Sequence, residues 1–188
     1  MKDKIKNIIK ESIGVKEKLS VNCLNDIQKV AELCIKTLKG GGKIIFCGNG
    51  GSAADSQHLA AELVVRFKKD RKAIAAMALT ANTSILTAIG NDYGYEKVFS
   101  RQLEALANKT DLLIAISTSG KAKNVAEAIR KAKEIGLKTV ALTGENGKEF
   151  AKSCDLSIIV PSGNTARIQE SHICIGHIIC EIIEESLC

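Results

Sequence analysis

The chain has 188 residues, of which 45% are apolar and 26% charged; this suits one sizeable hydrophobic core and excludes a largely disordered protein. Aromatic residues make up only 3%, which argues against a base-stacking platform for single-stranded nucleic acid. The net charge of +6 is spread thinly along the chain, so we expect no nucleic-acid partner. A mild positive excess instead favours a small anionic substrate.

The cysteines and the N-terminal residues indicate a reducing compartment. The seven cysteines form no CxxC pair and lie mostly in apolar runs, where a free cysteine behaves as a small hydrophobic residue. The first residues, MKDKIKNIIKESI, form a charged amphipathic segment rather than a secretory signal. No apolar run has the length needed to cross a membrane. We therefore expect a cytoplasmic protein without a membrane partner.

The first residues predict a helical extension. Apolar residues recur at helical spacing from Ile5 to Leu38, with a soft break near Ser20–Asn22, and the glycines Gly40–Gly42 then end the pattern. We predict one or two helices within residues 1–39, and we expect them to take part in oligomer contacts.

The rest of the chain, residues 43–188, alternates between apolar runs and helical segments. The predicted strands cover residues 43–48, 73–79, 111–117, 138–144 and 156–162. The predicted helices cover about 52–67, 95–106, 124–136, 147–154 and 165–187, with further helical residues between the strand 73–79 and about residue 88. Strands that are apolar throughout, each followed by a helix, are typical of a parallel sheet covered on both faces. We predict one doubly wound α/β domain with a five-stranded parallel sheet.

Three loops at the expected carboxyl ends of the strands are candidate ligand sites, because open α/β sheets bind ligands there. In the first, Gly48–Ser52, glycines let a ligand approach the backbone, and a helix start offers free N–H groups to an anion. A tight turn without a ligand remains an alternative. The loop also fits a loose dinucleotide-binding pattern, but the acidic residue that should end the next strand is missing.

The other two loops carry polar side chains. Ser117–Gly120 has the sequence STSG, and its three hydroxyls can donate to phosphate oxygens, whereas ordinary helix capping needs only one. In the third loop, Gly90–Tyr95, Asn91 and Asp92 either bind sugar hydroxyls or form an Asx turn. Two phosphate-type loops at one sheet edge favour a phosphorylated small molecule.

His58 and Glu62 lie four residues apart on the helix that follows the first loop. This spacing places them about 6 Å apart along the helix axis and about 40° apart around it, so that they can share one ion or substrate. A surface His–Glu pair is the alternative. The last helix also carries His172 and His177 among apolar residues, and their spacing of five places them on nearly opposite faces.

Four segments, met in this order, resemble the sugar isomerase (SIS) family and within it the sedoheptulose 7-phosphate isomerases: CGNGGSAADSQHLAAEL, TAIGNDYGYEKVFSRQ, ISTSG and RIQESHICIGHIICEIIE. The resemblance implies a flavodoxin-like SIS fold, one zinc ion per subunit and a homotetramer with active sites at subunit interfaces. It also implies conversion of D-sedoheptulose 7-phosphate to D-glycero-D-manno-heptose 7-phosphate. That reaction is the first step toward nucleotide-activated heptose for surface polysaccharides.

The resemblance also assigns residues by position. The metal ligands it implies are His58, Glu62, Gln169 and His177, of which Glu62 and His177 are also the acid/base pair. The substrate-binding residues it implies are Asn49, Gly50, Gly51, Ser52, Glu62, Asn91, Asp92, Ser117, Thr118, Ser119 and Gln169. The competing hypothesis is a non-catalytic SIS module that senses a phosphosugar or binds a protein such as the bacterial replication initiator. Such a module has no chemical need for the metal and acid/base residues.

Two positions require separate expectations. The family usually continues STSG with Asn-Ser, whereas this chain has Lys121 and Ala122, and we hypothesise that Lys121, in the first turn of a helix, contacts the phosphate instead. Gln169 and His177 are eight residues apart, about 12 Å along a regular helix and about 80° around it. We therefore expect an irregular helix near Gln169 or metal ligands from two subunits.

Overall fold

A five-stranded parallel sheet in the order β2-β1-β3-β4-β5 forms the centre of the computed structural model, which describes all residues 1–188. The strands are β1 Ile44–Gly48, β2 Ala76–Ala78, β3 Leu112–Ile116, β4 Lys138–Gly144 and β5 Leu156–Val160. This is the flavodoxin-like order, with its switch point between β1 and β3, where a ligand crevice is expected. Gly48 pairs with Ile116 in the register of these two strands, so their following loops are neighbours. The predicted fold class is confirmed.

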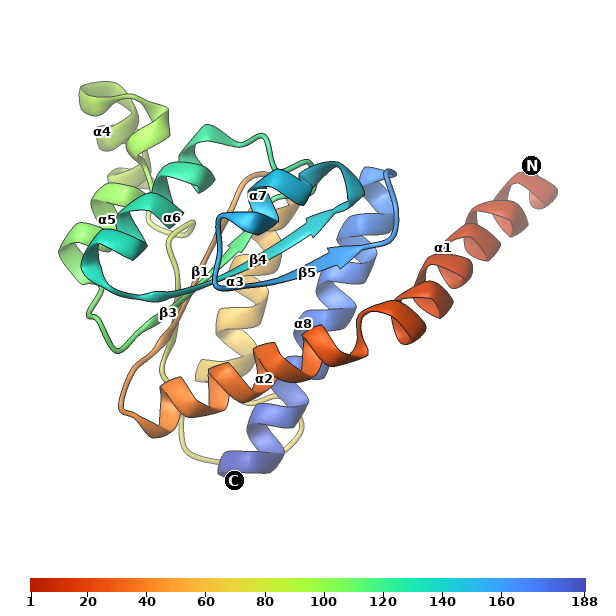
Figure 1. Cartoon of the computed structure of the whole chain (residues 1–188), viewed down its shortest axis with the longest axis horizontal. Coiled ribbons are helices and arrows are strands. Elements are labelled where there is room, and N and C mark those ends of the chain that lie inside the picture. Colours follow the sequence, from red (N-terminus) through yellow and green to blue (C-terminus); the bar gives the residue numbers. More distant parts are fainter.

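Helices cover both faces of the sheet (Figure 1). They are α1 Lys2–Asn22, α2 Leu24–Lys39, α3 Gly51–Val64, α4 Thr83–Tyr93, α5 Ser100–Leu106, α6 Lys123–Ile135, α7 Lys148–Lys152 and α8 Thr165–Leu187, with short 3-10 turns η1 Tyr95–Lys97 and η2 Glu145–Gly147. None of these helices combines the length and the apolar character that crossing a membrane requires.

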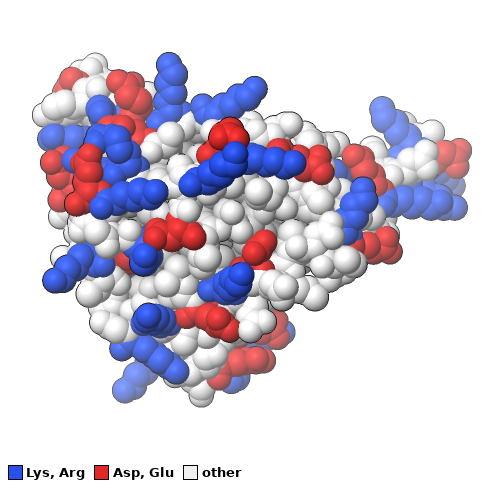
Figure 2. Space-filling model, in the orientation of Figure 1, with Lys and Arg blue, Asp and Glu red and all other residues white.

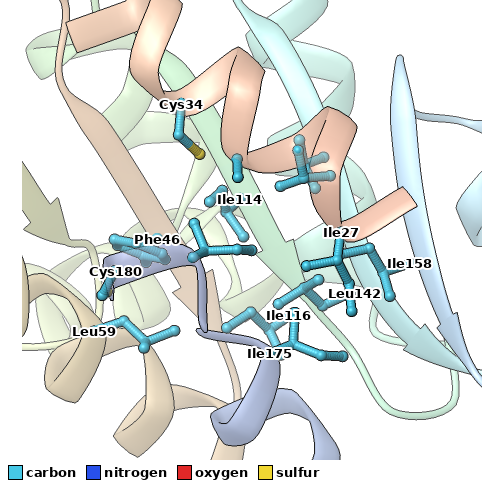
Figure 3. Close-up of a cluster of buried hydrophobic side chains, with 14 of the residues drawn as sticks. Ile27, Cys34, Phe46, Leu59, Ile114, Ile116, Leu142, Ile158, Ile175 and Cys180 are labelled. Carbon is cyan, nitrogen blue, oxygen red and sulfur yellow. The ribbon is translucent and has the colours of Figure 1, made fainter. Parts of the chain in front are cut away.

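Alternating strand residues divide the core into two clusters. Ile44 and Phe46 of β1 face α2, α3 and α8, and this larger cluster is shown in Figure 3. Ile45 and Cys47 of the same strand belong to the cluster under α5, α6 and α7. Every residue of β1 and β3 is buried, which explains why these strands are apolar along their whole length.

Several element boundaries differ from the prediction: β5 ends at Val160 rather than at residue 162, and the helix expected over 95–106 is η1 followed by α5. β2 pairs with β1 only through Ala76–Ala78, and not over residues 73–79, because the backbone N–H of Ile74 donates to the carbonyl of Leu63 at the end of α3. α3 itself ends at Val64 rather than at Phe67. The segment between them, residues 65–75, is therefore an irregular connection that runs beside the C-terminal part of α3.

The N-terminal extension consists of two helices that meet at Cys23, close to the predicted break. Figure 1 shows α1 projecting away from the sheet, and Ile5, Ile8, Ile9 and Ile13 are exposed along it. Its role in oligomer contacts stays a prediction. Elsewhere the surface mixes both signs of charge, and Figure 2 shows Lys and Arg interspersed with Asp and Glu on the face that it presents.

Candidate active site

The loop between β1 and α3 is closely packed. A side chain at Gly48 would meet Ser52 at 2.8 Å and the carbonyl of Ile116 at 3.0 Å. Gly50 caps α3 with a φ of +56°, a conformation that favours glycine. A side chain at Gly51 would lie 2.4 Å from Nε2 of Gln169, so the predicted loop residue and Gln169 are in contact. Glycine at these positions therefore keeps the backbone close to its neighbours and open to a ligand.

The loop after β3 lies beside it and is anchored through its backbone. Ser117 is buried, its N–H donates to the carbonyl of Leu142, and its carbonyl accepts from Thr143 Oγ1 at 2.6 Å. Thr118 is half-buried and Ser119 exposed. Because these contacts use the backbone of Ser117, the loop is fixed while the hydroxyls of Thr118 and Ser119 lie nearer the surface.

Asn124 joins the two loops, and sequence reasoning missed it. Its side-chain amide and that of Asn49 exchange two hydrogen bonds, each 2.8 Å long. Asn124 is only 4% exposed and lies in the first turn of α6. The signal in the sequence was a polar residue on the inward face of an amphipathic helix. This pair holds the glycine-rich loop against the start of α6.

Lys121 lies outside the helix in which it was predicted. α6 begins at Lys123 with Ala122 as its N-cap, so Lys121 precedes the first turn. Lys121 is exposed, and its backbone N–H faces Ser119 Oγ at 3.3 Å. The argument from the helix dipole therefore applies to Lys123, and the phosphate contact of Lys121 stays a prediction.

The predicted His58–Glu62 pair meets His177, and these three residues are called the HEH cluster below. Figure 1 shows α3 and α8 close together on one face of the sheet, and the two helices are in direct contact. Nε2 of His58 lies 2.8 Å from Nε2 of His177 and 3.3 Å from Oε1 of Glu62. The side chains of His58 and Glu62 are 47% and 21% exposed, so the cluster is open to a ligand.

The HEH cluster fits a divalent cation. The ligand atoms of its three residues all lie within 4.8 Å of one another and offer two imidazole nitrogens and a carboxylate oxygen. Zinc binds such a set tetrahedrally with bonds of about 2.1 Å, which places neighbouring ligand atoms about 3.4 Å apart. The distances within the cluster approach this value, and two imidazole nitrogens with one carboxylate oxygen are ligand types that suit a divalent cation.

Gln169 and His172 lie apart from the HEH cluster. α8 is helical without interruption from Thr165 to Leu187, so the expectation of an irregular helix near Gln169 is wrong. Gln169 instead covers Gly51, two turns before His177. His172 is 1% exposed on nearly the opposite side of α8 from His177. Neither ring nitrogen of His172 has a hydrogen-bond partner, and burial lowers its pKa to about 4.

Asn91 and Asp92 lie on the last turn of α4 rather than in a loop. Both are exposed, and their only side-chain hydrogen bond joins Asn91 Nδ2 to Asp92 Oδ1 at 2.7 Å. α4 has no buried residue and lies at the periphery in Figure 1. Within one chain, these two side chains therefore make no contact with the other predicted site residues, and their role stays a prediction.

Asp55 was missed by sequence reasoning although it lies one turn before His58 on α3. Its Oδ2 atom is buried without a hydrogen-bond partner. Burial raises the pKa of the Asp55 carboxyl above its usual value, and the nearby His58 partly offsets that rise. The spacing of Asp55, His58 and Glu62, by three and then four residues, is the pattern of a single helix face and was the available signal.

The relatives that comparison with known proteins finds agree with one another. A model described as SIS domain matches residues 9–144. The chain is 52% identical over 189 residues to the phosphoheptose isomerase of Clostridium acetobutylicum, covering 100% of this chain and 96% of that protein. It is 61% identical over 160 residues to phosphoheptose isomerase 1 of Campylobacter jejuni, covering 85% and 86%.

Solved structures lead to the same group. The phosphoheptose isomerase GmhA from Neisseria gonorrhoeae superposes with a TM-score of 0.93 at 43% identity and covers 98% of both chains. The NanR protein of Vibrio vulnificus complexed with ManNAc-6P has a TM-score of 0.69 at 16% identity, covering 97% of this chain and 63% of that one. The second likeness concerns the fold alone.

Proposed function

The chain belongs to the SIS domain family, and from this we infer that it is a phosphoheptose isomerase acting on D-sedoheptulose 7-phosphate, with D-glycero-D-manno-heptose 7-phosphate as the product. The observation that carries this inference is the HEH cluster, which α3 and α8 assemble beside two loops suited to phosphate. The relatives from Clostridium acetobutylicum, Campylobacter jejuni and Neisseria gonorrhoeae all bear the same enzyme name.

The phosphate would bind at the edge of the sheet. The backbone of Gly50–Ser52 lies at the start of α3, where free N–H groups and the helix dipole favour an anion. We assign the hydroxyls of Thr118 and Ser119 to the phosphate oxygens, with Ser117 as the anchor of the loop. Asn49, Gln169, Asn91 and Asp92 then remain for the sugar hydroxyls, the last two on α4.

Glu62 and His177 would share the proton transfers. In this scheme Glu62 removes the proton from C1 of the ketose and later delivers it to C2. His177 protonates the carbonyl oxygen O2 and accepts the proton that leaves O1, so the enediol collapses to the aldose. C1 and O1 each lose one proton, and C2 and O2 each gain one. The reaction therefore balances and needs no external oxidant or reductant. The ligand atoms of both residues lie within 4.8 Å of each other.

We propose zinc as the metal, held by His58, Glu62 and His177, with Gln169 supplied to the ion by a partner subunit. Bound zinc would polarise the sugar carbonyl and offset negative charge on the enediolate. The separation of Gln169 from His177 on a regular helix supports the two-subunit arrangement. A homotetramer would also cover the exposed isoleucines of α1. The proposed location is the cytoplasm, and the product would enter surface polysaccharide synthesis.

Turnover of sedoheptulose 7-phosphate by the purified protein tests this proposal. We expect activity that a chelator removes and zinc restores, and loss of that activity in Glu62→Gln, which keeps the shape of the side chain but cannot act as a base. Tight binding of the sugar phosphate without turnover would instead support the non-catalytic alternative, which the assembled HEH cluster does not favour.

A further inference from the structure

Three consecutive backbone N–H groups in the connection after α3 converge on one buried carboxylate. The N–H of Phe67 donates to Oε1 of Glu184 at 3.1 Å, and those of Lys68 and Lys69 donate to Oε2 at 2.8 and 3.0 Å. Glu184 lies on α8 and its side chain is 2% exposed. A charged group at this depth is costly unless it is fully paired, so the arrangement fixes where the connection lies.

Arg71 completes the arrangement and connects it to α3. Its Nε donates to Oε1 of Glu184 at 3.0 Å, and its side chain is 3% exposed. Its Nη1 donates to the carbonyl of Leu63 at 2.8 Å, and its Nη2 donates to the carbonyl of Glu62 at 2.9 Å. These carbonyls belong to the last turn of α3, which lacks intrahelical partners. Arg71 therefore caps the helix end that carries Glu62 and lets a cation face the negative end of its dipole.

Glu184 also affects His177, because the residue whose backbone it binds, Phe67, packs against His177. The ring of Phe67 lies 5.4 Å from the ring of His177, at an interplanar angle of 38°. Glu184 follows His177 by seven residues on α8, which is about 10 Å along the axis and only about 20° around it. Glu184 thus holds the backbone of Phe67 on the side of α8 that presents His177. One carboxylate and one guanidinium contact the surroundings of two members of the HEH cluster.

We propose that Glu184 and Arg71 are positioning residues that hold Glu62 and His177 of the HEH cluster at their working separation. Arg71 acts on Glu62 through the end of α3, and Glu184 acts on His177 through the ring of Phe67. The consequence for catalysis rests on the proposed function, whereas the consequence for the geometry of the cluster does not.

The variant Glu184→Gln tests the proposal at nearly constant volume. Each oxygen of Glu184 accepts from two donors: Phe67 and Arg71 on Oε1, and Lys68 and Lys69 on Oε2. A glutamine places an NH₂ group on one side, so two buried donors face a donor whichever way the amide turns. The connection must then shift, and the Phe67 ring with it.

Asp111 offers a matched control. Its carboxylate is also buried, at 3% exposure, and accepts from two backbone N–H groups and one cation: Lys43 N at 2.9 Å, Asn108 N at 2.8 Å and Lys43 Nζ at 2.6 Å. It lies just before β3, and its partners Lys43 and Asn108 make no hydrogen bond to Glu184, Arg71 or the HEH cluster. Asp111→Asn therefore imposes a comparable loss of hydrogen bonds on the fold without touching the residues around the HEH cluster.

The readouts are independent of substrate. The chain has only three histidines, so the ring signals of His58, His172 and His177 can be assigned in an NMR spectrum at fixed pH. We expect Glu184→Gln to move the signals of His177 and His58, because the Phe67 ring current acts on His177, and Asp111→Asn to leave them in place. Cobalt(II) affinity of the purified protein should fall about tenfold or more in Glu184→Gln and stay unchanged in Asp111→Asn.

Specific results would overturn the proposal. A folded Glu184→Gln with unchanged signals for His58 and His177 and unchanged cobalt affinity excludes positioning, as do equal changes in Asp111→Asn. If Glu184→Gln does not fold, the cobalt affinity of Phe67→Leu decides, since an unchanged affinity there excludes positioning of His177 through the Phe67 ring. If the signals and cobalt affinity respond as expected but the wild-type protein does not turn over the sugar phosphate, positioning stands and the proposed function fails.

Discussion

Replacing His172 by leucine should remove a pH dependence of stability. Both ring nitrogens of His172 are buried without a well-formed hydrogen bond, and desolvation lowers the pKa of the imidazole from 6.5 to about 4, although the backbone of Thr143 partly offsets this shift. Between these two values the unfolded chain binds a proton that the folded chain does not. The stability contribution is therefore intact above pH 6.5 and declines as the pH falls toward 4.

The magnitude follows from the size of the pKa shift. One unit corresponds to about 1.4 kcal/mol, so the full loss is about 3 kcal/mol, of which about 2 kcal/mol is already lost at pH 5. This is a large part of the stability of an ordinary domain, about 5–15 kcal/mol. Leucine has a similar volume and needs no hydrogen bond, so we expect His172→Leu to be at least as stable as the wild type at neutral pH.

Urea unfolding at several pH values between 7 and 4.5 measures the effect. Wild type, His172→Leu and His172→Gln are compared at one protein concentration, and the glutamine variant separates the loss of titration from the loss of polarity. His58 and His177 are present in all three proteins, so the difference between the curves isolates His172. Parallel curves over this range would refute the reasoning, since they would mean that His172 titrates equally in the folded and unfolded chains.

Two further predictions concern the glycine-rich loop. Gly51→Ala places a methyl group 2.4 Å from Nε2 of Gln169, so we expect little change in melting temperature but a higher KM for the sugar phosphate; Gly14→Ala, whose methyl group meets nothing within 4 Å, is the control. An unchanged KM would exclude Gln169 from substrate binding. Asn124→Ala removes both hydrogen bonds to Asn49 and should cost about 1 kcal/mol in urea unfolding, with weaker phosphate binding; an unchanged midpoint would contradict a role in anchoring the loop.

The sheet and its helices were predictable because local patterns determine them. β1 and β3 are buried along their whole length, and the apolar run of each is visible without any knowledge of its neighbours. β2 was predicted too long because an edge strand has only one partner, and Ile74 bonds to Leu63 instead. The end of α3 was missed for a related reason: Phe67 lies where a distant carboxylate holds the backbone, and no local pattern reports that.

The candidate site was only partly predictable. His58 and Glu62 share a helix, so their spacing revealed them, and the resemblance to a known family added His177. Arg71 and Glu184 read as ordinary solvated charges in the sequence, because they are 113 residues apart and only the packing of α3 on α8 brings them together. Spacing can reveal a pair within one element, whereas a pair across elements requires the topology.

Because α8 is a regular helix, Gln169 and His177 lie at two separate levels along it. α3 and α8 run side by side in the same direction, with Gln169 against Gly51 at one level and His177 against His58 at another. These levels are about 10 Å apart along α3. The phosphate-type loops lie at the first level, and the HEH cluster, to which we assign the proton transfers, lies at the second. A ligand that reacts at one end of an open carbon chain and carries its phosphate at the other suits this separation, whereas a phosphate next to the reacting carbon would leave one level unused.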